Sequence, residues 1–177
     1  MAVTGLKSNT WVNADGLLIA FGTSEATVTR GGEYDAPGRH WSEFDIDLSV
    51  LTTSGQIILS DTSTIPNGAF IEQVDVIVSE EPTDASGTAN LDLGLVDQDR
   101  STELDFNGFL AAADAFNAGT DLGKVTSYTV GTTEAGALIG TKLTNTGLVC
   151  ANADTAVFTD GVVKVRIYWF VPLAADL

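Results

Sequence analysis

The stretch DQDRSTELD, from Asp97 to Asp105, brings several carboxylates close together. Calcium loops take oxygen ligands from alternate positions, and the acidic residues from Asp97 onward have that spacing. An EF-hand loop would need Gly at its sixth position and Glu at its twelfth, where this chain has Thr102 and Gly108. The stretch is therefore not an EF-hand. Two interpretations stay open: a solvated connection, or another kind of calcium site built from Asp97, Asp99 and Asp105.

Two other groups of residues have the types found in hydrolytic enzymes. Asp45 and Asp47 lie on one face of an expected strand near Trp41, and a pair of carboxylates is what a glycoside hydrolase uses. Alternating aspartates on an exposed strand are ordinary in an acidic protein, and we favour that interpretation. Cys150 would need a base to act as a nucleophile, and the single histidine, His40, shares no local motif with it.

The common catalytic and nucleotide-binding motifs are missing. The sequence contains no G-x-S-x-G, H-E-x-x-H, P-loop or G-x-G-x-x-G pattern. With one histidine and one cysteine it also lacks the usual ligands of a zinc site. We therefore expect a protein that is not an enzyme and that holds no cofactor, with calcium at the acidic stretch as the one alternative.

Three tryptophans, Trp11, Trp41 and Trp169, are candidate interface residues. Tryptophan combines a large apolar surface with one N–H donor, and it is enriched in the centres of protein interfaces. Such residues anchor a core or a subunit contact more often than they form a platform for a ligand. We therefore predict that these side chains lie in a core or between subunits.

The charge balance limits the class of partner. The chain has 177 residues, enough for one domain, and a formal net charge of −16 with 8 Lys and Arg. So few cations cannot neutralise a phosphate backbone, and we expect neither nucleic acid nor a membrane as a partner. The N-terminus MAVTGLKSNTW has no hydrophobic signal region, so we expect synthesis in a cytoplasm without export by the usual signal.

Alternation of apolar and polar residues predicts strands over most of the chain beyond residue 40. The clearest patterns are EFDIDLSV at 43–50, FIEQVDVIVSEE at 70–81, TANLDLGLVD at 88–97 and VVKVRIYWF at 162–170. In the first pattern one face carries Phe44, Ile46, Leu48 and Val50. ALIGTKL at 137–143 and GLVCA at 147–151 are shorter candidates. Many short strands separated by Gly-, Thr- and Asn-rich turns predict an all-β protein, an antiparallel β-sandwich of jelly-roll-like topology.

Two segments depart from this pattern. GFLAAADAF at 108–116 predicts one short helix of about two turns, because it is rich in alanine. Residues 1–40 are interrupted by turn signals such as Asp15-Gly16 and Gly31-Gly32, which predict an irregular N-terminal arm. We therefore divide the chain into a loosely packed arm at 1–40 and a β-sandwich domain at 41–177.

The order of several segments resembles a known family. IPNGAFIEQVDVIVSE, GTANLDLGLVDQD and NGFLAAADAFNAG follow one another from residue 65, and TDGVVKVRIYWFVP comes near the C-terminus. Together they resemble the capsid decoration, or head cement, proteins of tailed bacteriophages. That family has a proline–glycine turn before a Val-rich strand, then a strand of the form LDLGL, and a closing T-x-G-x-x-x-V-x-V-x-Y pattern. The resemblance spans residues 65–172, and residues 1–64 match no family.

The resemblance implies a β-sandwich protein of the virion, without catalytic residues, made in the host cytoplasm. It implies a homotrimer on the capsid exterior that binds the major capsid protein and stabilises the shell. Two alternatives stay open. The first is another virion component, such as a head fibre, a tail protein or a receptor-binding protein. The second is a calcium-dependent carbohydrate-binding module, in which the acidic stretch would hold the ion.

Overall fold

The computed structural model describes residues 10–12, 18–20, 39–114 and 122–172, with side chains in the last two ranges. The chain divides into two compact units, Met1–Ala36 and Pro37–Leu177. In the first unit, β1 (Thr10–Val12) pairs antiparallel with β2 (Leu18–Ala20). Most of the predicted arm at 1–40 lies outside the described residues. All other strands belong to the second unit.

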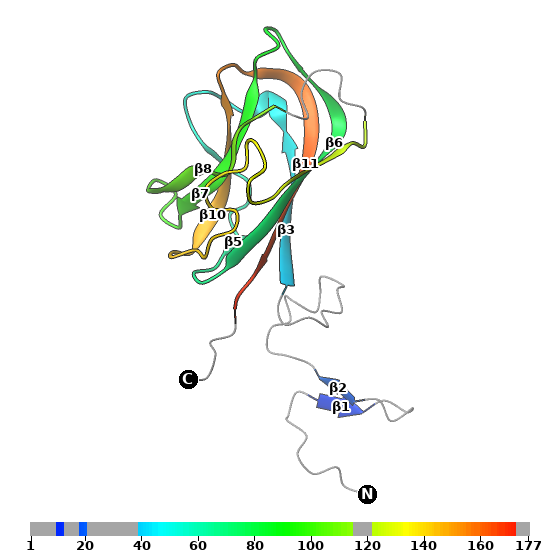
Figure 1. Cartoon of the computed structure of the whole chain (residues 1–177), viewed down its shortest axis with the longest axis vertical. Coiled ribbons are helices and arrows are strands. Elements are labelled where there is room, and N and C mark those ends of the chain that lie inside the picture. The colour runs from blue at the N-terminus through cyan, green and yellow to red at the C-terminus, as the bar shows by residue number, and fades with distance from the viewer. Residues whose placement is uncertain (1–9, 13–17, 21–38, 115–121, 173–177) are drawn as a thin grey trace, which may run out of the picture. The chain divides into compact units, whose positions relative to one another are not determined.

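The second unit contains two antiparallel sheets, which form separate layers (Figure 1). The four-stranded sheet has the order β3 (Arg39–Asp47), β11 (Phe158–Phe170), β6 (Phe70–Asp84) and β9 (Val125–Tyr128). The five-stranded sheet has the order β4 (Ile57–Ile58), β10 (Gly147–Asp154), β7 (Asn90–Asp97) and β8 (Glu103–Ala113), and β5 (Thr64–Ile65) also pairs with β10. This arrangement confirms the predicted all-β sandwich, while its jelly-roll-like topology stays a prediction.

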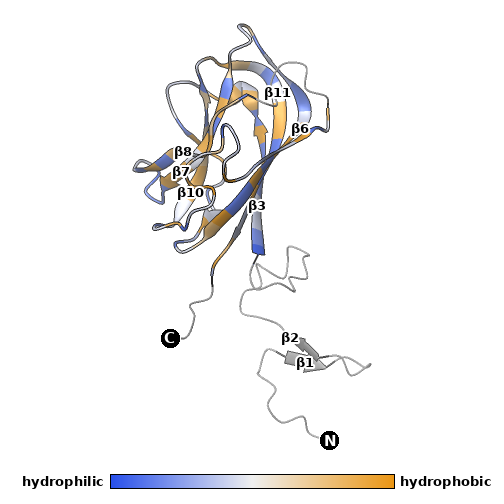
Figure 2. Ribbon diagram, in the orientation of Figure 1, coloured by the Kyte–Doolittle hydropathy of each residue, from blue (hydrophilic) through white to orange (hydrophobic). Residues whose placement is uncertain are grey.

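The main core lies between the two sheets. It takes alternate residues from β11, such as Val163 and Ile167, and from β7, such as Leu91 and Leu93, all 0% exposed. Figure 2 shows hydrophobic and hydrophilic residues alternating along these strands. Burying each such side chain stabilises the fold by about 1.5–3 kcal/mol. The period-two patterns of the sequence are therefore confirmed in β3, β6, β7 and β11.

The five-stranded sheet is also covered on its outer face, the side away from the main core. There Val96, Leu148 and Cys150 are buried, and Ile58 and Phe106 pack against them. A strand covered on both sides has a nearly continuous apolar sequence rather than an alternating one. β10, with the sequence GLVCANAD, has that form, and its residues are buried up to Ala153. Cys150 in this strand is fully buried.

The predicted helix at 108–116 is wrong, because residues 103–113 form β8 and pair with β7. Alanine prefers a helix by less than about 1 kcal/mol per residue over most other residues. Strand pairing instead leaves Phe109, Leu110 and Ala113 fully buried, which outweighs that preference. Among the described residues the one helical element is the 3-10 turn η1 (Leu48–Val50). No helix in the described part of the chain is long and apolar enough to cross a membrane.

Two smaller strand predictions are also wrong. The strand pattern at 43–50 ends early, because the Asp47 side chain accepts a hydrogen bond from the Ser49 N–H at 3.0 Å and starts η1. As a result Val50 is 53% exposed rather than inward-facing. Residues 137–143 form turns rather than a strand, and Gly140 there has a positive φ of 81°.

β8 carries a large bulge where it pairs with β7. Between the partners Leu93↔Leu110 and Leu95↔Asp105, β8 advances by more residues than β7 does. The extra residues of β8 pass directly over Gly94, which has no side chain. A Cβ atom at this position would lie 2.0 Å from the backbone oxygen of Asp105. The bulge folds over the outer face of the sheet, where its Phe106 packs against the buried residues there. We call Val96, Leu148 and Cys150, together with Ile58 and Phe106, the outer cluster.

Candidate interaction sites

The acidic stretch is the turn that joins β7 to β8. The carboxylate of Asp99 accepts hydrogen bonds from the backbone N–H groups of Ser101 and Thr102, each at 2.8 Å, and from the Thr102 hydroxyl. The Thr102 hydroxyl and these N–H groups lower the pKa of Asp99 to about 2. Asp97 accepts a hydrogen bond from the N–H of Gln98. These two carboxylates therefore shape the turn.

The third calcium candidate, Asp105, lies on β8 within the paired region. Burial raises the pKa of this carboxyl above its ordinary value. Within residues 39–114 and 122–172, no group of three or more His, Cys, Asp or Glu side chains lies close enough to hold a metal ion. Calcium binding by Asp97, Asp99 and Asp105 stays a prediction, and it would require the side chains of the turn to rearrange.

Cys150 and His40 lie in different sheets. Cys150 is fully buried on β10, and burial raises the pKa of its thiol to about 12. A thiol with so high a pKa stays protonated and unreactive at neutral pH. His40 lies on β3 and stacks on Trp169, with ring centroids 4.5 Å apart. The fold does not bring the two together as nucleophile and base.

Ion pairs cross the exposed face of β3 and β11. Lys164 contacts Glu43 at 2.8 Å and Asp45 at 2.9 Å, and Arg166 contacts Glu43 at 2.6 Å. The hydrogen bond from Lys164, followed by that from Arg166, lowers the pKa of Glu43. We call Glu43, Asp45, Lys164 and Arg166 the charge ladder. Asp45, considered above as half of a hydrolytic pair, is therefore one of its two carboxylates.

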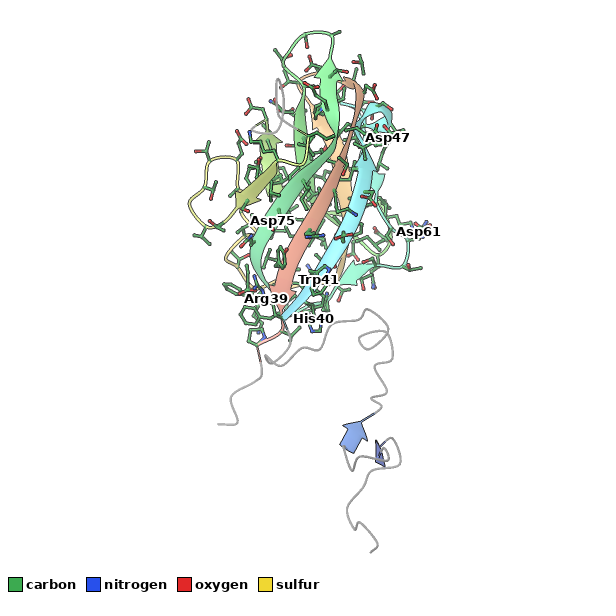
Figure 3. All side chains as sticks on the ribbon, turned by 90° about the vertical axis from the view of Figure 1, so that its right-hand side faces the viewer. Arg39, His40, Trp41, Asp47, Asp61 and Asp75 are labelled. Carbon is green, nitrogen blue, oxygen red and sulfur yellow. The ribbon has the colours of Figure 1, made fainter. Side chains whose placement is uncertain are left out.

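Aromatic side chains gather where β3 begins and β11 ends. Figure 3 labels Arg39, His40 and Trp41 at this end of the sheet. The Arg39 guanidinium lies 5.0 Å from the centre of the Tyr168 ring. We call the following group the aromatic end: Arg39, His40, Trp41, Phe70, Tyr168, Trp169 and Phe170.

Two of the predicted interface tryptophans belong to the aromatic end. Trp169 is partly buried against the main core, and its indole N–H donates to the Ser42 hydroxyl at 3.3 Å. Trp41 is 36% exposed, a large fraction for so apolar a side chain. Trp11 lies in β1 opposite Ile19, and its side chain is outside the described residues. The predicted interface role of all three stays a prediction.

Sequence reasoning missed a groove on the outer face of the five-stranded sheet. It has a volume of about 450 Å³, and two of its lining residues are Gln56 and Asn152. One side-chain oxygen of each is buried without a hydrogen-bond partner. The sequence did hold a signal for Asn152, because a single amide interrupts the apolar run GLVCANA.

No protein-family model matches this chain, and no curated protein matches it in sequence. Among solved structures, a chain in the capsid of Ralstonia phage GP4 is similar, with a TM-score of 0.51 and 20% identity. The match covers 79% of this chain and 89% of that chain. This chain shares its fold with a chain from a phage capsid.

Two further phage structures contain similar chains. A chain of the cyanophage Pam1 capsid asymmetric unit matches with a TM-score of 0.49 and 18% identity, over 81% of this chain and 96% of that one. A chain of the acidic stable capsid structure of Helicobacter pylori bacteriophage KHP30 matches with a TM-score of 0.48 and 19% identity, over 76% and 89%.

Proposed function

We propose that this protein is a non-enzymatic structural component of a phage virion that binds the outside of the capsid shell and stabilises it. The observation that carries the proposal is the fold shared with a chain of the Ralstonia phage GP4 capsid, which extends over 79% of this chain. The order of sequence segments from residue 65 to residue 172 supports the same class of protein independently. The strongly acidic composition suits a protein that must stay soluble until it assembles.

The proposed partners are the major capsid protein and further copies of this chain in a homotrimer. A protein that binds the assembled shell but not its separated subunits shifts the equilibrium toward the shell by mass action. A trimer that contacts several shell subunits at once gains further, because its second and third contacts form at a high effective concentration. Both effects would make the capsid more resistant to internal pressure and heat.

We place the contact with the shell, or between copies, at the aromatic end. Aromatic residues and arginine are enriched in the centres of interfaces, and this end carries both. Trp41 is 36% exposed and Val171, just beyond β11, is 41% exposed. Burying the ring of Trp41 would remove a large apolar surface from water. Trp11 is the further candidate from the first unit.

The test is co-sedimentation of the purified full chain with phage heads stripped of their accessory proteins, in buffers with calcium and with a chelator. We expect saturable binding at a fixed ratio to the shell protein. Trp41→Ala should weaken it at least about tenfold, because interface tryptophans are often energetic hot spots. The matched control is Val157→Ala, since Val157 is 48% exposed and lies in the connection between β10 and β11, outside the aromatic end.

Each result has a definite meaning. Absence of binding in both buffers would refute the capsid-binding function and favour a fibre or tail role. Binding that needs calcium would support Asp97, Asp99 and Asp105 as ligands. Sedimentation equilibrium of the free protein tests the homotrimer, and a monomer at micromolar concentration would contradict it.

A further inference from the structure

The groove on the outer face of the five-stranded sheet brings together two amide side chains. β4 pairs with β10 through Ile58↔Cys150 and Ile57↔Ala151. The next residue along each strand places Gln56 opposite Asn152, at the edge of the sheet. Both side chains line the groove, whose volume of about 450 Å³ is within the range of small-ligand sites in proteins.

The oxygen atoms of both amides lack a partner. Asn152 is 9% exposed, and neither its Oδ1 nor the Oε1 of Gln56 accepts a hydrogen bond in the described structure. Buried polar groups are nearly always hydrogen-bonded, so two unpartnered oxygens that line one groove are candidate acceptors for a ligand. A ligand that supplies an O–H or N–H donor to these oxygens would make hydrogen bonds that no described protein group makes.

The orientation of the Asn152 amide is fixed by its neighbours. Its N–H group donates to the backbone oxygen of Ala153 at 3.1 Å and also donates toward the carboxyl of Asp92, its cross-strand partner. These two contacts identify which of the two amide atoms is the nitrogen. The other amide atom is the oxygen, Oδ1, which is the buried atom without a hydrogen-bond partner.

The rest of the lining combines an apolar wall with a polar rim. Ile58, Val96 and Phe106 form the wall and belong to the outer cluster. Arg100 also lines the groove, and its guanidinium forms an ion pair with Asp61 at 3.0 Å. The segment from residue 53 to residue 55 borders the groove and is exposed, so a small shift of this segment would admit a ligand to the amides.

This lining selects the chemistry of the ligand. The amide oxygens are acceptors, so the ligand must bring O–H or N–H donors, which carboxylates and phosphates lack. Asp61 and Asp92 near the groove, in a chain of net charge −16, also disfavour an anion. The apolar wall requires a flat face of C–H groups on the same molecule. A neutral sugar ring has donors at its edge and such a face.

A peptide fits this groove less well. Peptides usually bind beside a sheet by adding a strand to a free edge, where main-chain hydrogen bonds provide the affinity. The edge strand here, β4, has 2 residues, which is too short to pair with an added strand. Sugar hydroxyls, by contrast, both donate and accept, so they can satisfy the amide oxygens and the hydroxyls of Thr53 and Ser54 together.

We propose that this groove binds a neutral saccharide. The oxygens of Gln56 and Asn152 accept hydrogen bonds from its hydroxyls, and Phe106, with Ile58 and Val96, packs against the apolar face of a sugar ring. The site uses no metal ion, and it is independent of the capsid-binding function and of the aromatic end. A virion protein with such a groove would carry a contact for a cell-surface glycan in addition to its contact with the shell.

The test is an array of immobilised neutral and sialylated oligosaccharides, probed with the labelled full chain in buffer containing a chelator, with affinities then measured by titration calorimetry. Two variants remove the site in different ways. Asn152→Leu removes the acceptor, and Gly55→Trp fills the groove from a position where an added Cβ meets nothing within 4 Å. The control is Thr133→Trp, which adds the same side chain at an exposed turn outside the groove.

We expect binding to at least one neutral oligosaccharide, weakened at least about tenfold by each groove variant and unchanged in the control. Thermal melting of each variant verifies that it is folded. Gly55→Trp keeps the test decisive if Asn152→Leu fails to fold. The inference is overturned if no neutral glycan binds, if binding survives both groove variants, or if only sialylated glycans or peptides added in a parallel titration bind. None of these results depends on whether the protein binds capsids.

Discussion

Gly94 lies in the middle of β7 beneath the bulge of β8, and the structure leaves no room there for a methyl group. In Gly94→Ala the new Cβ would lie 2.0 Å from the backbone oxygen of Asp105 and 2.4 Å from the backbone carbon of Phe106. Ordinary contacts of this kind begin at about 3.4 Å, so the bulge would have to move by about 1.4 Å (3.4 minus 2.0). Both obstacles are backbone atoms, which cannot move aside by a rotamer change.

The size of the effect follows from four contributions. A Gly→Ala change gains about 0.4–1 kcal/mol from the unfolded state, and burying one methyl group adds about 0.8 kcal/mol. Against this, overpacking a core costs about 1–3 kcal/mol and more when backbone must shift, and each ladder hydrogen bond lost between β7 and β8 costs about 1 kcal/mol. We expect a net loss of about 3 kcal/mol, which lowers Tm by about 6–12 °C in a domain of this size.

The assay is urea denaturation followed by circular dichroism, supported by thermal melting. Gly55→Ala is the matched control, because an added Cβ there meets nothing within 4 Å. We expect the control to stay within about 0.5 kcal/mol of the parent protein. A loss below about 1 kcal/mol in Gly94→Ala would show that β8 does not cross Gly94 as described. The same variant should also weaken saccharide binding, since Phe106 forms part of the groove wall.

Three further predictions concern charge and the single thiol. Burial raises the pKa of Asp92 above 3.8, so the folded state holds this proton more tightly, and the stability that Asp92 contributes falls as pH rises through the raised value. Asp92→Asn should therefore raise Tm near neutral pH, with a gain that shrinks as pH falls to 3.8; a gain independent of pH would contradict this cause. Glu43→Gln breaks the charge ladder and should lower Tm slightly at low salt but not at about 1 M salt, and a loss that persists in salt would point to packing instead. Cys150 should react with iodoacetamide only as the protein unfolds in urea, because it is buried with a thiol pKa of about 12, and rapid labelling of the native protein would place it at the surface.

The strands of the main core could be predicted because their information is local. A strand with one buried face must alternate, whichever strand becomes its neighbour, and Val163, Val165 and Ile167 show this in the sequence as clearly as in the fold. β10 departs from alternation because it is covered on both sides. That cover comes from the outer cluster, whose members are distant in sequence, so the pattern alone cannot say what lies on the second face.

The candidate site residues show a similar limit. The spacing of Asp97, Asp99 and Asp105 predicts a set of oxygen ligands for a metal ion. Spacing does not say whether a metal ion or hydrogen-bond donors of the protein contact these carboxylates. In the folded turn, Ser101 and Thr102 donate to Asp99, because a tight hairpin turn brings their N–H groups within reach of its side chain.

The sequence by itself determined the all-β class, the main core and the acidic character of the chain, since each depends on residue type and short-range period. Tertiary structure alone decided that the alanine-rich segment 108–113 is a strand, because pairing with β7 outweighs a small helix preference. It also decided that Gln56 meets Asn152, because only the register between β4 and β10 sets residues so far apart in the chain opposite each other. Short-range periodicity predicts most of the strands, and pairing between distant strands decides ambiguous segments and determines which side chains meet.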